Sequence, residues 1–182
     1  YMDTTRPLTG GNGLLTKDGI YKPVFYSFLF MNRMKGKIIE KGENYLITCN
    51  RDNEYYILAF KPEKFGHVYY LNKESQIKED MLDDIYEDQG EMNITFEILN
   101  CRESRYRMKM WNMTEKGSVL TQWRMMGKPE QISSEEARYL RALCRPSIEK
   151  REGKISDGTL KFDLTLKSHQ ITQIQIIIDD ND

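Results

Sequence analysis

From residue 37 onward, apolar and polar residues alternate along much of the chain. The segment 92–98 has the clearest pattern, because apolar side chains occupy every second position: Met92, Ile94, Phe96 and Ile98. A period of two is typical of antiparallel strands with one buried and one solvent-facing side. Similar runs occupy 45–49, 55–60, 106–110, 160–167 and 173–178. About eight such strands in one unit predict an antiparallel β-sandwich, so the expected fold class is mainly β.

The first 36 residues have a different pattern, so we expect a boundary between residues 1–36 and a C-terminal β-sandwich over 37–182. Glycine-rich residues 9–13 predict a loop. A helix is expected to begin at Pro23, because proline is tolerated in the first turn, and to end before Gly36. Its apolar residues recur at helical spacing, and they are Phe25, Phe28, Leu29 and Met31.

One further short helix is predicted to begin near Ser133. Ser133 and Glu136 have the spacing of a capping box, in which the two side chains satisfy backbone N–H groups of the first turn. An apolar stripe over 139–143 follows, and Pro146 ends the helix. A second helix is also considered over 77–85.

The charges are nearly balanced, with 27 Lys and Arg against 28 Asp and Glu, a formal net charge of −1. Proteins that bind nucleic acid or an anionic membrane carry clustered positive charge, so we expect neither partner. Three scattered cysteines and two histidines have no metal-ligand spacing, so no metal or cofactor is expected. Reduced cysteines favour a cytoplasmic location. Because Tyr1 is not methionine, we expect that the sequence begins inside a longer protein.

No catalytic site can be assembled from these residues. Hydrolysis of a glycosidic bond needs two converging carboxylates. The acidic residues lie instead on the polar sides of the predicted strands or in the stretch 79–84, which is typical of a solvated surface. Gly10 and Gly11 are not followed by the Lys-Ser/Thr pair of a phosphate-binding loop, so a structural turn is the better interpretation.

The aromatic residues allow two interpretations. Exposed rings can stack on the apolar faces of sugars, and the pair Tyr69 and Tyr70 is our candidate for such a platform. Large aromatic residues in a sandwich more often fill the space between its sheets. Both interpretations apply to the same six residues, which are Tyr55, Tyr56, Tyr69, Tyr70, Trp111 and Trp123.

The order of several segments resembles the C-terminal part of glycoside hydrolase family 39, which includes β-xylosidases. Residues 9–15 (TGGNGLL) and 19–28 (GIYKPVFYSF) resemble the Gly-Gly-x-Gly-Leu and Gly-Ile-x-Lys-Pro segments at the end of that family's catalytic barrel. The stretch 117–146 looks like the one that follows its sandwich strands. Residues 164–171 (LTLKSHQI) are similar to the turn before its last strand.

This resemblance implies that residues 1–36 are the last loop and helix of a (β/α)₈ barrel and that the remainder is an accessory sandwich. The family's catalytic glutamates lie on barrel strands further upstream, so the resemblance implies no catalytic residue in this chain. We therefore expect that the fragment is not an enzyme and that its partner is the upstream barrel of the parent chain. Gly10 and Gly11 match a loop near the substrate face of the barrel and would border its pocket.

The same unit also resembles the C-terminal half of large bacterial AraC-type transcriptional regulators, to which residues 55–61 and 69–71 are at least as similar. We expect a non-catalytic accessory domain, with a sugar-responsive regulator as the leading interpretation of the parent. The alternatives are the accessory domain of a β-xylosidase and a carbohydrate-binding module. Phe25, Phe28 and Leu29 are expected to pack on the sandwich strands, or between two copies in a homodimer.

Overall fold

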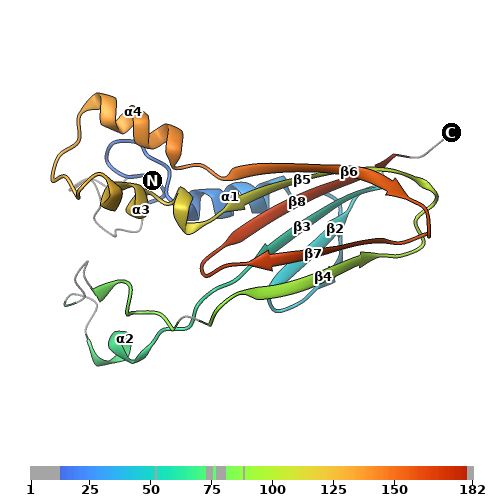
Figure 1. Ribbon diagram of the computed structural model, residues 1–182, viewed down its shortest axis with the longest axis horizontal. Coiled ribbons are helices and arrows are strands. Elements are labelled where there is room, and N and C mark those ends of the chain that lie inside the picture. Colours follow the sequence, from blue (N-terminus) through green and yellow to red (C-terminus); the bar gives the residue numbers. More distant parts are fainter. Residues whose placement is uncertain (1–12, 52, 73–75, 77–80, 88, 180–182) are drawn as a thin grey trace.

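The computed structural model describes residues 13–51, 53–72, 76, 81–87 and 89–179. The expected mainly β, antiparallel architecture is confirmed (Figure 1). The strands of the described residues are β1 (Lys37–Lys41), β2 (Tyr45–Cys49), β3 (Glu54–Phe60), β4 (Met92–Ile98), β5 (Ser104–Met113), β6 (Ser147–Ile155), β7 (Leu160–Leu166) and β8 (Ile171–Asp179).

Two antiparallel sheets form the body of the protein. The larger has six strands in the order β1-β2-β3-β8-β5-β6, and the smaller pairs β4 with β7. The C-terminal strand β8 lies between β3 and β5, so it hydrogen-bonds to strands from both halves of the chain. The larger sheet is therefore continuous only because β8 joins β3 to β5.

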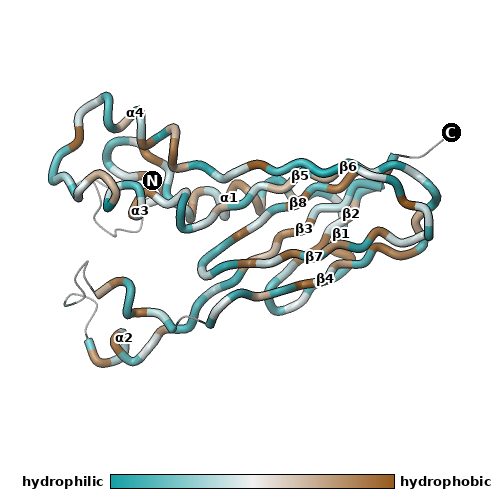
Figure 2. The backbone as a smooth tube through the Cα atoms, in the orientation of Figure 1, coloured by the Kyte–Doolittle hydropathy of each residue, from teal (hydrophilic) through white to brown (hydrophobic). Residues whose placement is uncertain are grey.

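The main core lies between the two sheets. Ile174 and Ile176 of β8 face β4 and β7, and Leu164 and Leu166 of β7 contribute from the other side. Along β7 the buried positions alternate with more exposed ones, as the sequence pattern predicts, whereas in β8 residues 172–174 are all buried and the alternation holds only from Ile174 onward. Figure 2 shows the same alternation of apolar and polar residues along the strands.

Helix α1 (Pro23–Arg33) packs on the opposite side of the large sheet. Its buried residues are Tyr26 and Phe30, which form a cluster with Leu58 of β3 and Met113 of β5. Phe25 and Leu29 lie against this cluster as expected, but the expectation is wrong for Phe28, which is 54% exposed. The buried stripe is set by the side of the helix that meets the sheet, and the apolar spacing alone does not specify that side.

The sharp turn after α1 requires a glycine. Gly36 has φ of +86°, and a Cβ atom there would lie 2.0 Å from the carbonyl oxygen of Cys49. The chain therefore passes directly against β2 as it enters β1. Any side chain at this position would push the two strands apart.

The predicted helix after Ser133 is confirmed as α4 (Ser134–Leu143), with both hydrogen bonds of the capping box between Ser133 and Glu136. The sequence pattern did not predict α2 (His67–Leu71), the 3₁₀ turn η3 (Glu115–Gly117) or α3 (Val119–Met125). The first residues of the helix considered over 77–85 lie outside the described residues, and residues 82–84 form turns.

Candidate functional site

The connection between β3 and β4 forms a projection that we call the aromatic arm, defined by the described residues of 61–91. Its two sides are joined by an antiparallel bridge between Phe65 and Tyr86. The backbone N–H of Gly66 donates to the carbonyl oxygen of Ile85 at 2.7 Å. In Figure 1 the arm, with α2, projects from the end of the sandwich nearest α1.

Rings from three parts of the chain stack in the arm. Phe65 is stacked on Tyr69, with ring centroids 3.9 Å apart, and on Tyr86 at 5.1 Å. Tyr86 in turn forms a T-shaped pair with His169, with ring centroids 4.4 Å apart. His169 lies in the β7–β8 turn with φ of +55°, so the row of rings ties the arm to the sandwich.

The two tyrosines of the predicted pair, Tyr69 and Tyr70, have different surroundings. Tyr69 is partly buried because one face of its ring is covered by Phe65. Tyr70 is 73% exposed and stands almost perpendicular to Tyr69, at an interplanar angle of 82°. The two rings therefore do not form one flat platform, and a sugar can reach the ring of Tyr70 more freely than that of Tyr69.

A buried ion pair between Lys61 and Glu63 lies at the base of the arm. The Glu63 side chain is only 1% exposed. Burial by itself would raise its pKa, but hydrogen bonds from Lys61 and Ser168 and the charge of Lys61 outweigh that effect and lower the pKa. Glu63 is thus held ionised, as an anchor of the arm to the β7–β8 turn.

Residues 13–34 also pack on the helices between β5 and β6. Ile20 forms a buried cluster with Val119, Leu140 and Cys144. The hydroxyl of Tyr26 donates a hydrogen bond of 2.8 Å to the carbonyl oxygen of Cys144. Burial raises the pKa of the Cys144 thiol to about 11, so the thiol stays neutral and is not a nucleophile at physiological pH.

Other candidate positions do not come together. His67 begins α2 and is exposed, far in the sequence from His169. Within the described part of the chain, no group of three or more His, Cys, Asp and Glu residues is placed to hold a metal ion. Among the same residues, no helix is long and apolar enough to cross a membrane. Gly10 and Gly11 lie outside the described residues.

No protein-family model matches the sequence. Solved structures do share its fold. A glycoside hydrolase family 39 enzyme from Xanthomonas axonopodis pv. citri superposes with a TM-score of 0.73 and 15% identity, over 94% of this chain and 33% of its own. A monomeric β-xylosidase from Caulobacter crescentus CB15 has a TM-score of 0.71 and 17% identity, over 96% of this chain and 34% of its own.

A bacterial orthologue of human α-L-iduronidase is also similar, with a TM-score of 0.61 and 12% identity, over 90% of this chain and 28% of its own. Identity at this level establishes the fold alone. The region shared with the glycosidases covers nearly all of this chain. The chain therefore has the fold of the C-terminal domain of family 39 glycoside hydrolases and spans about a third of the length of those proteins.

Proposed function

We propose that this chain is the non-catalytic accessory part of a family-39-glycosidase-like protein and that α1 packs on an upstream (β/α)₈ barrel. The observation that carries the proposal is a second apolar stripe on α1. Val24, Phe28 and Met31 are all exposed and recur at i, i+4 and i+7. They lie on the side opposite Tyr26 and Phe30, which face the sheet.

A helix that is apolar on both sides is typical of a helix buried between two layers. In the described residues, one layer is the six-stranded sheet, and nothing covers the other side. The chain spans about a third of the xylosidase that it resembles in fold. A barrel in the remaining two thirds of a parent protein would supply the second layer.

Replacing Phe28 by Asp tests this proposal. In the 182-residue chain, we expect Phe28→Asp to change the free energy of unfolding by less than about 0.5 kcal/mol, because the side chain is already exposed. In the longer parent protein, the same substitution would bury a charge at the barrel interface and lower the melting temperature by several degrees.

Phe30→Asp is the matched control on the same helix. Phe30 is completely buried against the sheet, so this variant is expected to unfold both the short chain and the parent. If Phe28→Asp leaves the parent as stable as the wild type, the barrel does not pack on this stripe. If instead the short chain is a dimer that Phe28→Asp converts to a folded monomer, the stripe packs between two copies.

The non-catalytic role has a direct test of its own. The purified 182-residue chain is expected to release no nitrophenol from aryl xylosides above the rate in buffer, whereas the catalytic residues of a barrel enzyme come from several barrel strands. Turnover that survives repurification of the chain would contradict the proposal.

The nature of the parent is a separate part of the proposal. The sequence resemblance favours a sugar-responsive AraC-type regulator, with a β-xylosidase as the alternative. Determining the reading frame upstream of Tyr1 distinguishes them. A barrel with two strand-end glutamates would identify a hydrolase, whereas a helix-turn-helix pair before a barrel without those glutamates would identify a regulator.

Carbohydrate binding is a second candidate function, and the exposure of the Tyr70 ring favours it. We expect xylan to retard the chain in a native gel and Tyr70→Ala to abolish the retardation. Tyr139→Ala is a suitable control, because Tyr139 is an exposed tyrosine on α4, away from the aromatic arm. Equal retardation of wild type and Tyr70→Ala would contradict this role.

A further inference from the structure

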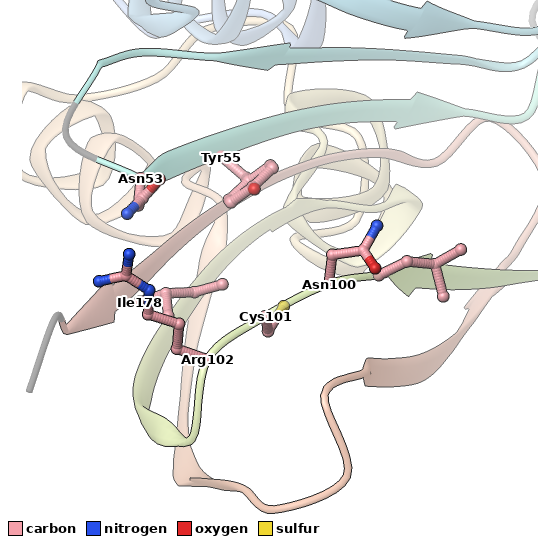
Figure 3. A pocket seen from close by; sticks show the side chains of 7 residues that line it. Asn53, Tyr55, Asn100, Cys101, Arg102 and Ile178 are labelled. Carbon is pink, nitrogen blue, oxygen red and sulfur yellow. The ribbon is translucent and has the colours of Figure 1, made fainter.

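A cavity of about 330 Å³ opens at the end of the sandwich opposite the aromatic arm. Its wall is formed by the beginning of β3, the β4–β5 connection and the end of β8. The lining residues are Asn53, Tyr55, Leu99, Asn100, Cys101, Arg102 and Ile178. Figure 3 shows Asn53 and Tyr55 on the β3 side, with Asn100, Cys101 and Arg102 on the connection across from them.

Hydrogen bonds hold the backbone on each side of this cavity. The N–H of Ile178 donates to the carbonyl oxygen of Asn53 at 3.4 Å, and the N–H of Cys101 donates to that of Gly158 at 2.9 Å. Asn53 and Asn100 both have positive φ, at 51° and 57°. Asparagine tolerates this conformation better than most residues, so it fits both turns. The cavity is therefore formed before any ligand arrives.

Arg102 gives the described lining of the cavity a positive charge. It supplies a guanidinium group, and none of the other described lining residues has a carboxylate. Among the described residues Arg102 makes no ion pair, whereas Asp179 at the end of β8 is paired with Arg107 at 2.8 Å.

Glu54, which lies between the lining residues Asn53 and Tyr55 in the sequence, also has interaction partners. Its carboxylate accepts hydrogen bonds from Asn50 at 2.8 Å and from the hydroxyl of Tyr56 at 2.7 Å. Tyr56 is on the side of β3 opposite Tyr55, because side chains alternate along a strand. The carboxylate of Glu54 therefore has hydrogen-bond partners of its own, and it forms no ion pair with Arg102 among the described residues.

We propose that this cavity binds a small hydroxylated anion of the size of one sugar unit, with its carboxylate or phosphate group on Arg102. Guanidinium groups bind both anions through paired, charge-assisted hydrogen bonds. The side-chain amides of Asn53 and Asn100 carry donors and acceptors for hydroxyl groups. Leu99 and Ile178 provide apolar contact for the carbon skeleton. The volume lies at the lower end of the range of ligand sites.

Titration of the 182-residue chain with three probes tests the proposal. The probes are glucuronate, glucose 6-phosphate and neutral glucose, and binding is followed through the side-chain amide resonances of Asn53 and Asn100. We expect saturable shifts with at least one anion and an affinity for it at least about tenfold higher than for glucose. The anion that binds with the higher affinity identifies the charged group that the cavity prefers.

Arg102→Gln is expected to weaken binding of that anion by about tenfold or more, because it removes the charge and keeps most of the length of the side chain. Arg105→Gln is the matched control, since Arg105 is also exposed but does not line the cavity.

Occupation of the cavity should also slow alkylation of Cys101 relative to Cys49, which lies outside the lining. Equal affinity for glucose, undiminished binding by Arg102→Gln or no saturable shift with either anion would overturn the proposal.

Discussion

The β-sandwich and the helical end of this protein differ in how much of their apolar surface they bury. Between the two sheets, twelve buried residues of the described chain form one continuous cluster. At the helical end, formed by residues 13–34 with α3 and α4, burial is divided between two clusters of four residues, one of which includes Leu58 and Met113 of the sheet. The helical end also leaves the stripe of Val24, Phe28 and Met31 exposed. The sandwich thus has one continuous core, whereas the helical end has an exposed apolar stripe, which is the surface that we propose as an interface.

Breaking the sandwich core should have the largest effect on stability. Leu166 on β7 is completely buried in the main cluster. We expect Leu166→Ala to lower the free energy of unfolding by about 2–5 kcal/mol, because it removes apolar contact and leaves a cavity. Urea denaturation followed by circular dichroism measures this change.

Ile148→Ala on the edge strand β6 is the control for that variant, since Ile148 is 57% exposed. Its expected effect is within about 0.5 kcal/mol. Similar losses from the two variants would mean that the space between the sheets is not the dominant source of stability.

Removing a single hydrogen bond at the helical end should have an intermediate effect on the free energy of unfolding. Tyr26→Phe removes the hydroxyl that bonds the carbonyl oxygen of Cys144 and keeps the ring in its cluster. Burial raises the pKa of Tyr26, so the hydroxyl remains a donor at neutral pH. We expect a loss of about 1 kcal/mol in urea denaturation. Tyr139→Phe, at an exposed tyrosine of α4, should have no measurable effect. Equal stabilities of Tyr26→Phe and the wild type would show that this bond contributes nothing.

The smallest expected effect concerns the pH dependence of the aromatic arm. The pKa of Glu63 is lowered from its ordinary value of 4.5 in the folded state. Its ionisation therefore stabilises the arm fully above the unfolded pKa, and this contribution is lost as the pH falls through the folded pKa. The effect should be local, because the arm is separate from the main core.

Near-ultraviolet circular dichroism of the tyrosines, recorded while the pH is lowered, measures this loss. We expect the signal of the arm to change before the far-ultraviolet signal of the strands. Glu63→Gln should remove this early change, whereas Glu87→Gln, at an exposed carboxylate of the same arm, should retain it. An early change that persists in Glu63→Gln would assign the titration to another group.

The candidate sugar platform was only partly predictable. Tyr69 and Tyr70 stand out in the sequence as neighbouring aromatic residues. Their actual surroundings depend on Phe65, Tyr86 and His169, and no sequence pattern connects these residues with the tyrosine pair. The bridge between residues 65 and 86 and the β7–β8 turn bring these rings together. A local sequence pattern cannot predict contacts between residues as far apart in the chain as Phe65, Tyr86 and His169.

The amino-acid sequence by itself determined the elements whose pattern is local. Alternation with a period of two defines a strand with one buried face, as in β4 and β7. The Ser133–Glu136 capping box marks the start of α4, because both of its hydrogen bonds form within one turn.

The tertiary structure alone decided the elements whose partners are distant. Strand β6 is almost entirely exposed and has no apolar alternation, yet it pairs along its length with β5 at the sheet edge. It forms a strand because its backbone N–H and C=O groups pair with those of β5. This pairing does not depend on which side chains β6 has. Likewise, α1 has two apolar stripes, and only the position of the sheet determines that Tyr26 and Phe30 are buried while Phe28 is exposed.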